Sequence, residues 1–192
     1  KKMLSGQTIK PGDVVIGLPS NGLHTNGYTL ARKVIFETAK MKGTDKVPGS
    51  RQSVFKALQA PHTNYAPLIQ ALLKKFNTGR SSKFRKSNSI FGIAHITGGG
   101  FTGNIPRILP KKVDVEIDAS TWKPLPIFDL IQKSGVIDFD EMYEVFNMGI
   151  GMTLVASAED ADAILKFCHA KGTKAVAIGQ ASKGEGNVKL KR

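Results

Sequence analysis

Three consecutive glycines, Gly98 to Gly100, constrain the fold of this chain more than any other feature of its sequence. They follow an apolar run, residues 90–96, that is typical of a buried strand. Residues 101–109, after the glycines, have a helical pattern that Pro110 ends. The run therefore predicts a strand, a glycine loop and a helix in succession, with His95 at the end of the strand beside the loop.

The residues of this loop leave two interpretations open. Glycines have no side chain, so the amides of Gly98 to Gly100, together with Thr97, can approach an anion at the start of the following helix. Alternatively, the glycines form only a tight turn, and His95 is a hydrogen-bonded core residue. The spacing is not that of a phosphate-binding P-loop, because no lysine follows the glycines before Lys111.

Positive charge is concentrated in one part of the sequence. The formal net charge is +13, and the segment from Lys46 to Lys112 contains twelve Lys or Arg residues but no Asp or Glu. This asymmetry indicates a phosphate-bearing partner, either a small phosphorylated ligand or a nucleic acid. Within the segment, residues 77–89 are rich in serine and basic residues, and we interpret them as a solvated loop insert. Their single aromatic residue, Phe84, argues against nucleic acid as a partner.

Size and composition bound the class of protein. A chain of 192 residues that is 41% hydrophobic can bury a core, and we expect a single domain over residues 1–192. Its one cysteine, Cys168, lies in an apolar helical pattern, so we place it in the core. A single cysteine excludes a disulfide framework and is typical of a reducing compartment, which favours the cytoplasm. No apolar run approaches the length of a membrane-spanning helix, and no membrane partner is expected.

A second strand–loop–helix unit lies near the start of the chain. Residues 13–18 predict a short buried strand, and a helical pattern begins after Thr25 or Asn26, either of which can cap the helix. The loop between strand and helix contains Asn21, Gly22, His24, Thr25 and Asn26. Because both loops carry glycine and a histidine, we expect them to face one ligand from two sides.

The other predicted elements mix helices and strands without strict alternation. Helices are expected at residues 54–58, 66–76, 128–133, 140–146 and 159–171, and strands at residues 113–118, 152–156, 175–178 and 188–190. Ser157 is expected to cap the helix at 159–171, and Asp138 precedes Glu141 at capping-box spacing. The pattern predicts an α+β fold in which helices are layered around one mixed sheet.

Three segments in series carry a resemblance to a known family. They are KPGDVVIGLPSNGLHTNGYTLARKV, GIAHITGGGFTGNIPRILP and VIDFDEMYEVFNMGIGMTLV. In order and spacing they resemble the phosphoribosylformylglycinamidine cyclo-ligase (aminoimidazole ribonucleotide synthetase) family, over the whole chain except residues 77–89. The resemblance implies the α+β fold of that family's C-terminal domain, an architecture that selenophosphate synthetase and thiamine-monophosphate kinase share.

The resemblance also implies a reaction and a set of site residues. The family uses ATP and Mg²⁺ to activate the formyl amide oxygen of formylglycinamidine ribonucleotide, and the amidine nitrogen then closes the imidazole ring of aminoimidazole ribonucleotide in purine biosynthesis. His24 and His95 match motif histidines and are the candidate catalytic residues. The candidate residues for binding substrate and phosphate are Asn21, Gly22, Thr25, Asn26, Thr97, Gly98, Gly99, Gly100, Asn147 and Gly149.

The segments that carry the resemblance correspond to the C-terminal half of a longer enzyme. In the family, the N-terminal half supplies most contacts to ATP and Mg²⁺ and the core of the dimer. We expect no metal ligands in this chain, since no cluster of acidic residues lies near the motifs. The resemblance therefore implies that the 192 residues alone are inactive, and that the full-length enzyme is a homodimer.

One motif departs from the family pattern. The usual Pro-Thr-x-Ile-Tyr appears here as Pro61-His62-Thr63-Asn64-Tyr65, a change that can alter a ligand contact. The alternative to the enzyme is a diverged, non-catalytic module of the same fold that binds phosphate or nucleic acid.

Overall fold

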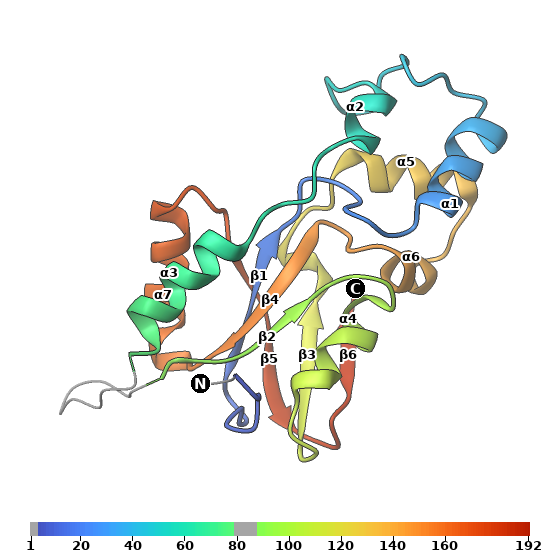
Figure 1. The fold of residues 1–192 in the computed structure, drawn as a ribbon. Helices are drawn as coiled ribbons and strands as arrows, with labels where there is room; N and C mark the ends of the chain where they lie inside the picture. Colours follow the sequence, from blue (N-terminus) through green and yellow to red (C-terminus); the bar gives the residue numbers. More distant parts are fainter. Residues whose placement is uncertain (1–3, 79–87) are drawn as a thin grey trace.

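A mixed β-sheet with helices around it forms the fold in the computed structural model, which describes residues 4–78 and 88–192 (Figure 1). The described strands are β1 (Val14–Pro19), β2 (Ile90–His95), β3 (Val113–Asp118), β4 (Ile150–Ala156), β5 (Val176–Lys183) and β6 (Val188–Lys191). Their order across the sheet is β2-β4-β1-β5-β3-β6. Neighbouring strands are antiparallel except β3 and β6, which are parallel. The predicted α+β fold with a mixed sheet is confirmed.

Strand burial follows position in the sheet. Strand β1 lies between β4 and β5, and its residues Val15, Ile16 and Leu18 are all fully buried, which requires cover on both faces. Burial along β3 alternates instead, with Val115 buried and Glu116 partly exposed. The alternation predicted for residues 113–118 is therefore confirmed.

Helices α3 (Ala66–Phe76) and α7 (Ala161–Ala170) cover one face of the sheet and lie side by side (Figure 1). The bounds of α3 agree with the prediction, and its apolar face supplies Leu72 and Phe76 to the core. Cys168 on α7 is fully buried in the same cluster, which confirms its predicted place in the core.

The opposite face of the sheet packs against a second, larger apolar cluster. The short helix α4 (Gly100–Asn104) and the 3₁₀-helix η2 (Ile105–Ile108) contribute to it. Beyond one end of the sheet, further helices gather and extend this core (Figure 1). They are α1 (Tyr28–Arg32), the π-helix η1 (Lys33–Thr38), α2 (Val54–Leu58), α5 (Pro126–Gly135) and α6 (Phe139–Val145).

The helix predicted over residues 101–109 is wrong in its second half. Helix α4 ends at Asn104, and the chain continues as the 3₁₀-helix η2, with Pro106 near its start. Proline has no backbone N–H and clashes with the preceding turn, so it cannot continue an α-helix.

Two predicted helix caps are also wrong. Helix α1 begins after Gly27, which has a left-handed φ of 77°, rather than after Thr25 or Asn26. Ser157 precedes a 3₁₀ turn, η4 (Ala158–Asp160), and its side chain does not cap α7. At Asp138, by contrast, Oδ1 accepts a hydrogen bond of 2.8 Å from the amide of Glu141, as the capping spacing predicted.

Two further predictions concern the solvated basic insert and the absence of a membrane-spanning helix. Most of the basic insert predicted at 77–89 lies outside the described residues. In the two described ranges, no helix combines the length and the apolar character needed to cross a bilayer.

Candidate functional site

The loops that follow β1 and β2 meet at the same end of the sheet. Strand β4 lies between these two strands, and Leu18 of β1 and His95 of β2 both pair with Met152 of β4. The two strands therefore end at the same level. Where the loops meet, Thr97 Oγ1 donates a hydrogen bond of 2.7 Å to Asn26 Oδ1. The two loops are therefore in contact, and the expectation that they face one ligand from two sides stays a prediction.

The glycine loop is held from inside the protein. The amide of Gly99 donates to the carbonyl oxygen of Glu144, and the amide of Gly100 to that of Thr97, each at 2.9 Å. These two amides are not available to a ligand in this structure, which corrects the expectation of a three-amide anion cradle. Gly98 remains a candidate, because its amide makes no hydrogen bond to another described residue.

Asn147 supports the first loop and does not reach a ligand. Its side chain is buried, and its amide nitrogen donates to the carbonyls of Gly22 and Leu23 at 3.0 and 3.1 Å. Its Oδ1 accepts from Ser20 Oγ at 2.7 Å and from the amide of Gly149 at 2.8 Å. These bonds occupy the donors and acceptors of the side chain. The prediction that Asn147 orients substrate is corrected to a positioning role.

The remaining predicted residues divide between surface and core. Asn21 and Thr25 are exposed, and Asn21 Nδ2 donates to the carbonyl of Pro61 at 2.7 Å. Gly22 is buried in the turn, and Gly149 has a φ of 96° that favours glycine. A role of these residues in binding substrate stays a prediction.

Three histidines from three separate segments converge where the loops meet. The ring of His24 stacks on that of His62 with centroids 3.9 Å apart and an interplanar angle of 22°. The centroids of His62 and His95 are 5.2 Å apart. His24 is buried, whereas the other two rings are exposed, so the interpretation of His95 as a core residue is wrong.

His24 is held in an uncommon conformation. Its φ of 60° lies in the left-handed region, which few non-glycine residues adopt. The amide of Thr63 donates to its Nε2 at 3.4 Å, and the hydroxyl of Thr63 lies 3.3 Å from the same atom. Its Nδ1 is buried and has no hydrogen-bond partner among the described residues. Backbone strain of this kind is concentrated at functional sites.

Burial sets the charge state of two of the histidines. It lowers the pKa of His24 to about 4, with further lowering by the nearby His62 and His95. Burial, followed by His62, also lowers the pKa of His95. Both rings are therefore neutral near pH 7 and can accept a proton or donate a hydrogen bond.

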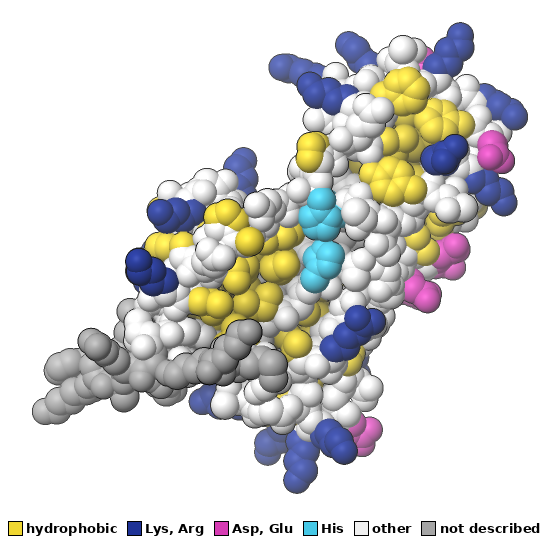
Figure 2. Space-filling view, viewed as in Figure 1, with side chains coloured by type: hydrophobic (Ala, Val, Ile, Leu, Met, Phe, Trp, Pro, Cys, Tyr) yellow, Lys and Arg dark blue, Asp and Glu magenta, His cyan; other side chains and the backbone are white. Residues whose placement is uncertain are grey.

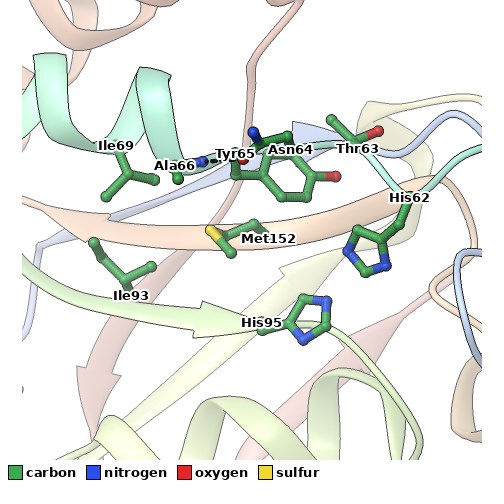
Figure 3. A pocket seen from close by; sticks show the side chains of 9 residues that line it. All are labelled: His62, Thr63, Asn64, Tyr65, Ala66, Ile69, Ile93, His95 and Met152. Carbon is green, nitrogen blue, oxygen red and sulfur yellow. Dashed lines mark hydrogen bonds between the residues drawn. The ribbon is translucent and has the colours of Figure 1, made fainter.

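A cleft with a volume of about 580 Å³ opens beside the two exposed histidines. Figure 2 shows histidine side chains at the border of an apolar hollow. The lining residues, which Figure 3 labels, are His62, Thr63, Asn64, Tyr65, Ala66, Ile69, Ile93, His95 and Met152. Among the described residues, no Lys or Arg belongs to this lining. The wall therefore suits a ligand with an apolar or aromatic part, and imidazoles supply polar contacts at one end.

Two residues of the site were not singled out as site residues from the sequence. His62 was visible only as a departure from the Pro-Thr-x-Ile-Tyr motif. Asn104 is buried, and its side-chain nitrogen donates to the carbonyl of Gly100 at 2.7 Å, which fixes the glycine loop. No local pattern distinguishes such an asparagine from any other polar residue in a helix.

Comparison with known proteins decides the family. The profile described as AIR synthase related protein, C-terminal domain, matches residues 10–191. The chain belongs to this family. The phosphoribosylformylglycinamidine cyclo-ligases of Bacillus cytotoxicus and Syntrophus aciditrophicus are 42% and 43% identical to it over 97% and 96% of its length. The match takes up 50% of each relative, so the chain spans about half the length of these curated proteins.

A solved structure supports the fold independently of close sequence similarity. Thiamine-monophosphate kinase from Stenotrophomonas maltophilia superposes with a TM-score of 0.58 at 12% identity. The match covers 96% of this chain and 52% of the kinase chain. The sheet and helices described above are therefore an arrangement already known from a solved structure. The resemblance found in the sequence is confirmed by the family match and by the relatives.

Proposed function

We propose that this chain forms the C-terminal half of an ATP-dependent cyclo-ligase that converts formylglycinamidine ribonucleotide to aminoimidazole ribonucleotide. The observation that carries the proposal is the 42% identity, over 97% of the chain, to a protein named as that enzyme. The geometry supports it, because the two loops with the motif histidines meet beside a cleft of about 580 Å³.

The proposed reaction has two steps. The γ-phosphoryl group of ATP is transferred to the formyl oxygen of the substrate, and ADP leaves. The amidine nitrogen then attacks the activated carbon, the carbon–oxygen bond breaks, and phosphate leaves with the oxygen. The attacking nitrogen must lose a proton, and a neutral imidazole can accept it.

His95 is the better placed of the two candidate bases. It is exposed at the end of β2 and lines the cleft, whereas His24 is buried behind the exposed His62. We assign proton transfer to His95 and a positioning role to His24. The amide of Gly98 is the candidate contact for a phosphate group, because the single hydroxyl proton of Thr97 is donated to Asn26 Oδ1.

ATP, Mg²⁺ and the partner half of the site belong to the same proposal. We infer that the N-terminal half of the enzyme, the part of the relatives that the match does not include, supplies most contacts to ATP and Mg²⁺. The same half joins two subunits into a homodimer. A purely phosphate- or nucleic-acid-binding module is not favoured by the comparisons.

The test is reconstitution. The chain is joined to the N-terminal half of the Bacillus cytotoxicus relative, and ADP formation from ATP is measured with formylglycinamidine ribonucleotide and Mg²⁺. We expect substrate-dependent ADP release from the joined protein and none from the 192 residues alone. A folded joined protein without this activity would contradict the proposal.

A further inference from the structure

We propose that His24, His62 and His95 form a binding site for a divalent transition-metal ion such as Zn²⁺. One ring nitrogen of each residue lies within 4.8 Å of those of the other two. The three residues come from the loop after β1, the segment between α2 and α3, and the end of β2. An ion bound there would tie together three segments that are distant in the sequence.

The donor set selects the class of metal. It consists of three imidazole nitrogens, and no carboxylate or thiol of a described residue joins the group. Mg²⁺ and Ca²⁺ prefer oxygen ligands, whereas imidazole suits Zn²⁺, Co²⁺, Ni²⁺ and Cu²⁺. The proposed site is therefore distinct from any Mg²⁺ that accompanies ATP, and it does not depend on the proposed function. Because a ring nitrogen bound to a metal has no lone pair left for a proton, His95 acts as the base of the proposed reaction only when the ion is absent.

The distances are wider than those of a loaded site and require one ring to move. Zinc–nitrogen bonds of about 2.0–2.1 Å at a tetrahedral angle place ligand nitrogens roughly 3.3 Å apart. A metal ion lies in the plane of each ring that binds it, so the stacked rings of His24 and His62 cannot both bind as they stand. His62 is the ring that can turn, because it is exposed and lies on a segment between helices.

The other two histidines already have defined positions beside the proposed site. His95 ends β2, where it pairs with Met152. His24 is buried, with its Nε2 beside Thr63. Its Nδ1 is buried without a hydrogen-bond partner among the described residues, an arrangement that is rare in native proteins and is often explained by a bound water or ion. This unpartnered nitrogen is an independent indication of a ligand. When Nδ1 binds an ion, the ring proton lies on Nε2, which then donates to the hydroxyl of Thr63, 3.3 Å away, in place of accepting from the Thr63 amide.

Three protein ligands leave coordination positions open. In zinc sites with three protein ligands, the open position holds water or a substrate atom. His62 and His95 also line the cleft, so the ion would face whatever occupies it (Figure 3). The usual family motif, Pro-Thr-x-Ile-Tyr, has threonine at the position of His62. A three-histidine site would therefore distinguish this chain from proteins with that motif.

The test uses Co²⁺ as a spectroscopic substitute for Zn²⁺. The purified chain, without a histidine tag, is treated with EDTA, dialysed and titrated with Co²⁺. We expect one Co²⁺ per chain with the visible absorption of a nitrogen-coordinated ion. Zn²⁺ should displace it, and an excess of Mg²⁺ should not.

Variants identify the ligands. His62→Thr and His95→Asn should each weaken Co²⁺ binding by roughly 100-fold or more, because even the loss of an outer partner of a ligand costs about 10–100-fold. His169→Gln is the matched control, since His169 lies on α7, outside the cluster, and its loss should leave binding unchanged. Circular dichroism melting without metal checks that each variant is folded.

Three results would overturn the site. They are an absence of stoichiometric Co²⁺ binding, equal binding by His62→Thr and the unchanged chain, and loss of binding in His169→Gln. Because His62 is exposed, His62→Thr should fold, and its result decides the question even if His95→Asn does not fold. No enzymatic activity is measured, so failure of this site is distinguishable from failure of the proposed function.

Discussion

Thr97 Oγ1 donates a hydrogen bond of 2.7 Å to Asn26 Oδ1, across 71 residues of sequence. The bond joins the loop after β2 to the loop after β1. These loops carry His95 and His24, the two candidate catalytic residues. The separation of the two imidazoles therefore depends on a contact between side chains that do not themselves line the large cleft.

Removing this bond should destabilise the protein. Thr97→Val deletes the donor and leaves Asn26 Oδ1 unpaired, so we expect a loss of about 1–2 kcal/mol in the free energy of unfolding by urea. Thr173→Val is the control, because Thr173 is also partly buried and its hydroxyl makes no hydrogen bond to a described residue. We expect the control to change stability by less than about 0.5 kcal/mol. Equal effects of the two substitutions would show that the loop contact contributes little.

Two glycines of α4 should respond in opposite ways to alanine. A Cβ at Gly100 would lie 1.7 Å from the carbonyl oxygen of Tyr143, and its φ is +58°. We expect Gly100→Ala to cost roughly 3 kcal/mol or more in denaturant unfolding. Gly103 is in the same helix, and a Cβ there meets nothing within 4 Å. Gly103→Ala should be neutral or stabilise by up to about 1 kcal/mol. A similar cost at both positions would contradict the close approach of Gly100 to α6.

Stability should fall on mild acidification because of His24. The ordinary pKa of a histidine is 6.5 and that of His24 in the folded protein is about 4, so between these values the unfolded chain binds a proton that the folded chain does not. The contribution of His24 to stability is therefore fully present above pH 6.5 and decreases as the pH falls from 6.5 towards 4. The measurement is the urea midpoint across this window in EDTA, which keeps metal ions away from the ring. His24→Asn should flatten this part of the profile, and an unchanged slope would argue against His24 as its source.

Local patterns were sufficient for most of the strands and for several helices. Residues 54–58 and 66–76 have a helical apolar period without an internal breaker beyond the first turn, and the structure has helices α2 and α3 over the same residues. The helix expected over 101–109 was wrong only after Asn104, because Pro106 prevents the α-helix from continuing although the apolar spacing does. The expected cap at Thr25 or Asn26 was wrong because α1 begins after Gly27. Gly27 takes a left-handed conformation, and no side chain caps the helix.

The candidate site was harder to predict than the fold. Motif resemblance singled out His24 and His95, yet it gave no reason to place His62 between their loops. That placement depends on the path of the chain between α2 and α3, which only the packed structure determines. Asn147 was wrongly assigned to substrate for a related reason. Its sequence neighbours suggest a polar loop, whereas its partners Gly22 and Leu23 are more than a hundred residues away.

Cys168 should be unreactive in the folded protein. It is fully buried on α7, and burial raises the pKa of its thiol to about 11, so little thiolate forms near pH 7. We expect a thiol reagent to label the native chain only as fast as the chain opens, and to label it at once in denaturant. Mass spectrometry of the labelled chain measures the rate. Rapid labelling without denaturant would show that α7 does not cover the sheet as described.

His95→Asn separates chemistry from binding in the proposed reaction. Asparagine retains a hydrogen-bonding group but cannot transfer a proton at neutral pH. In the protein joined to the N-terminal half of the Bacillus cytotoxicus relative, we expect kcat to fall by roughly 10²-fold with little change in KM. Because the pKa of His95 is lowered by burial and by His62, the acidic limb of the pH–rate profile should lie below pH 6.5 in the unchanged protein. That limb should be lost in the variant.

His169→Gln is the control, since it removes a histidine of α7 outside the three-histidine cluster and should leave both constants unchanged. A raised KM with an unchanged kcat would mean that His95 only binds substrate, and full activity of the variant would remove it from the reaction.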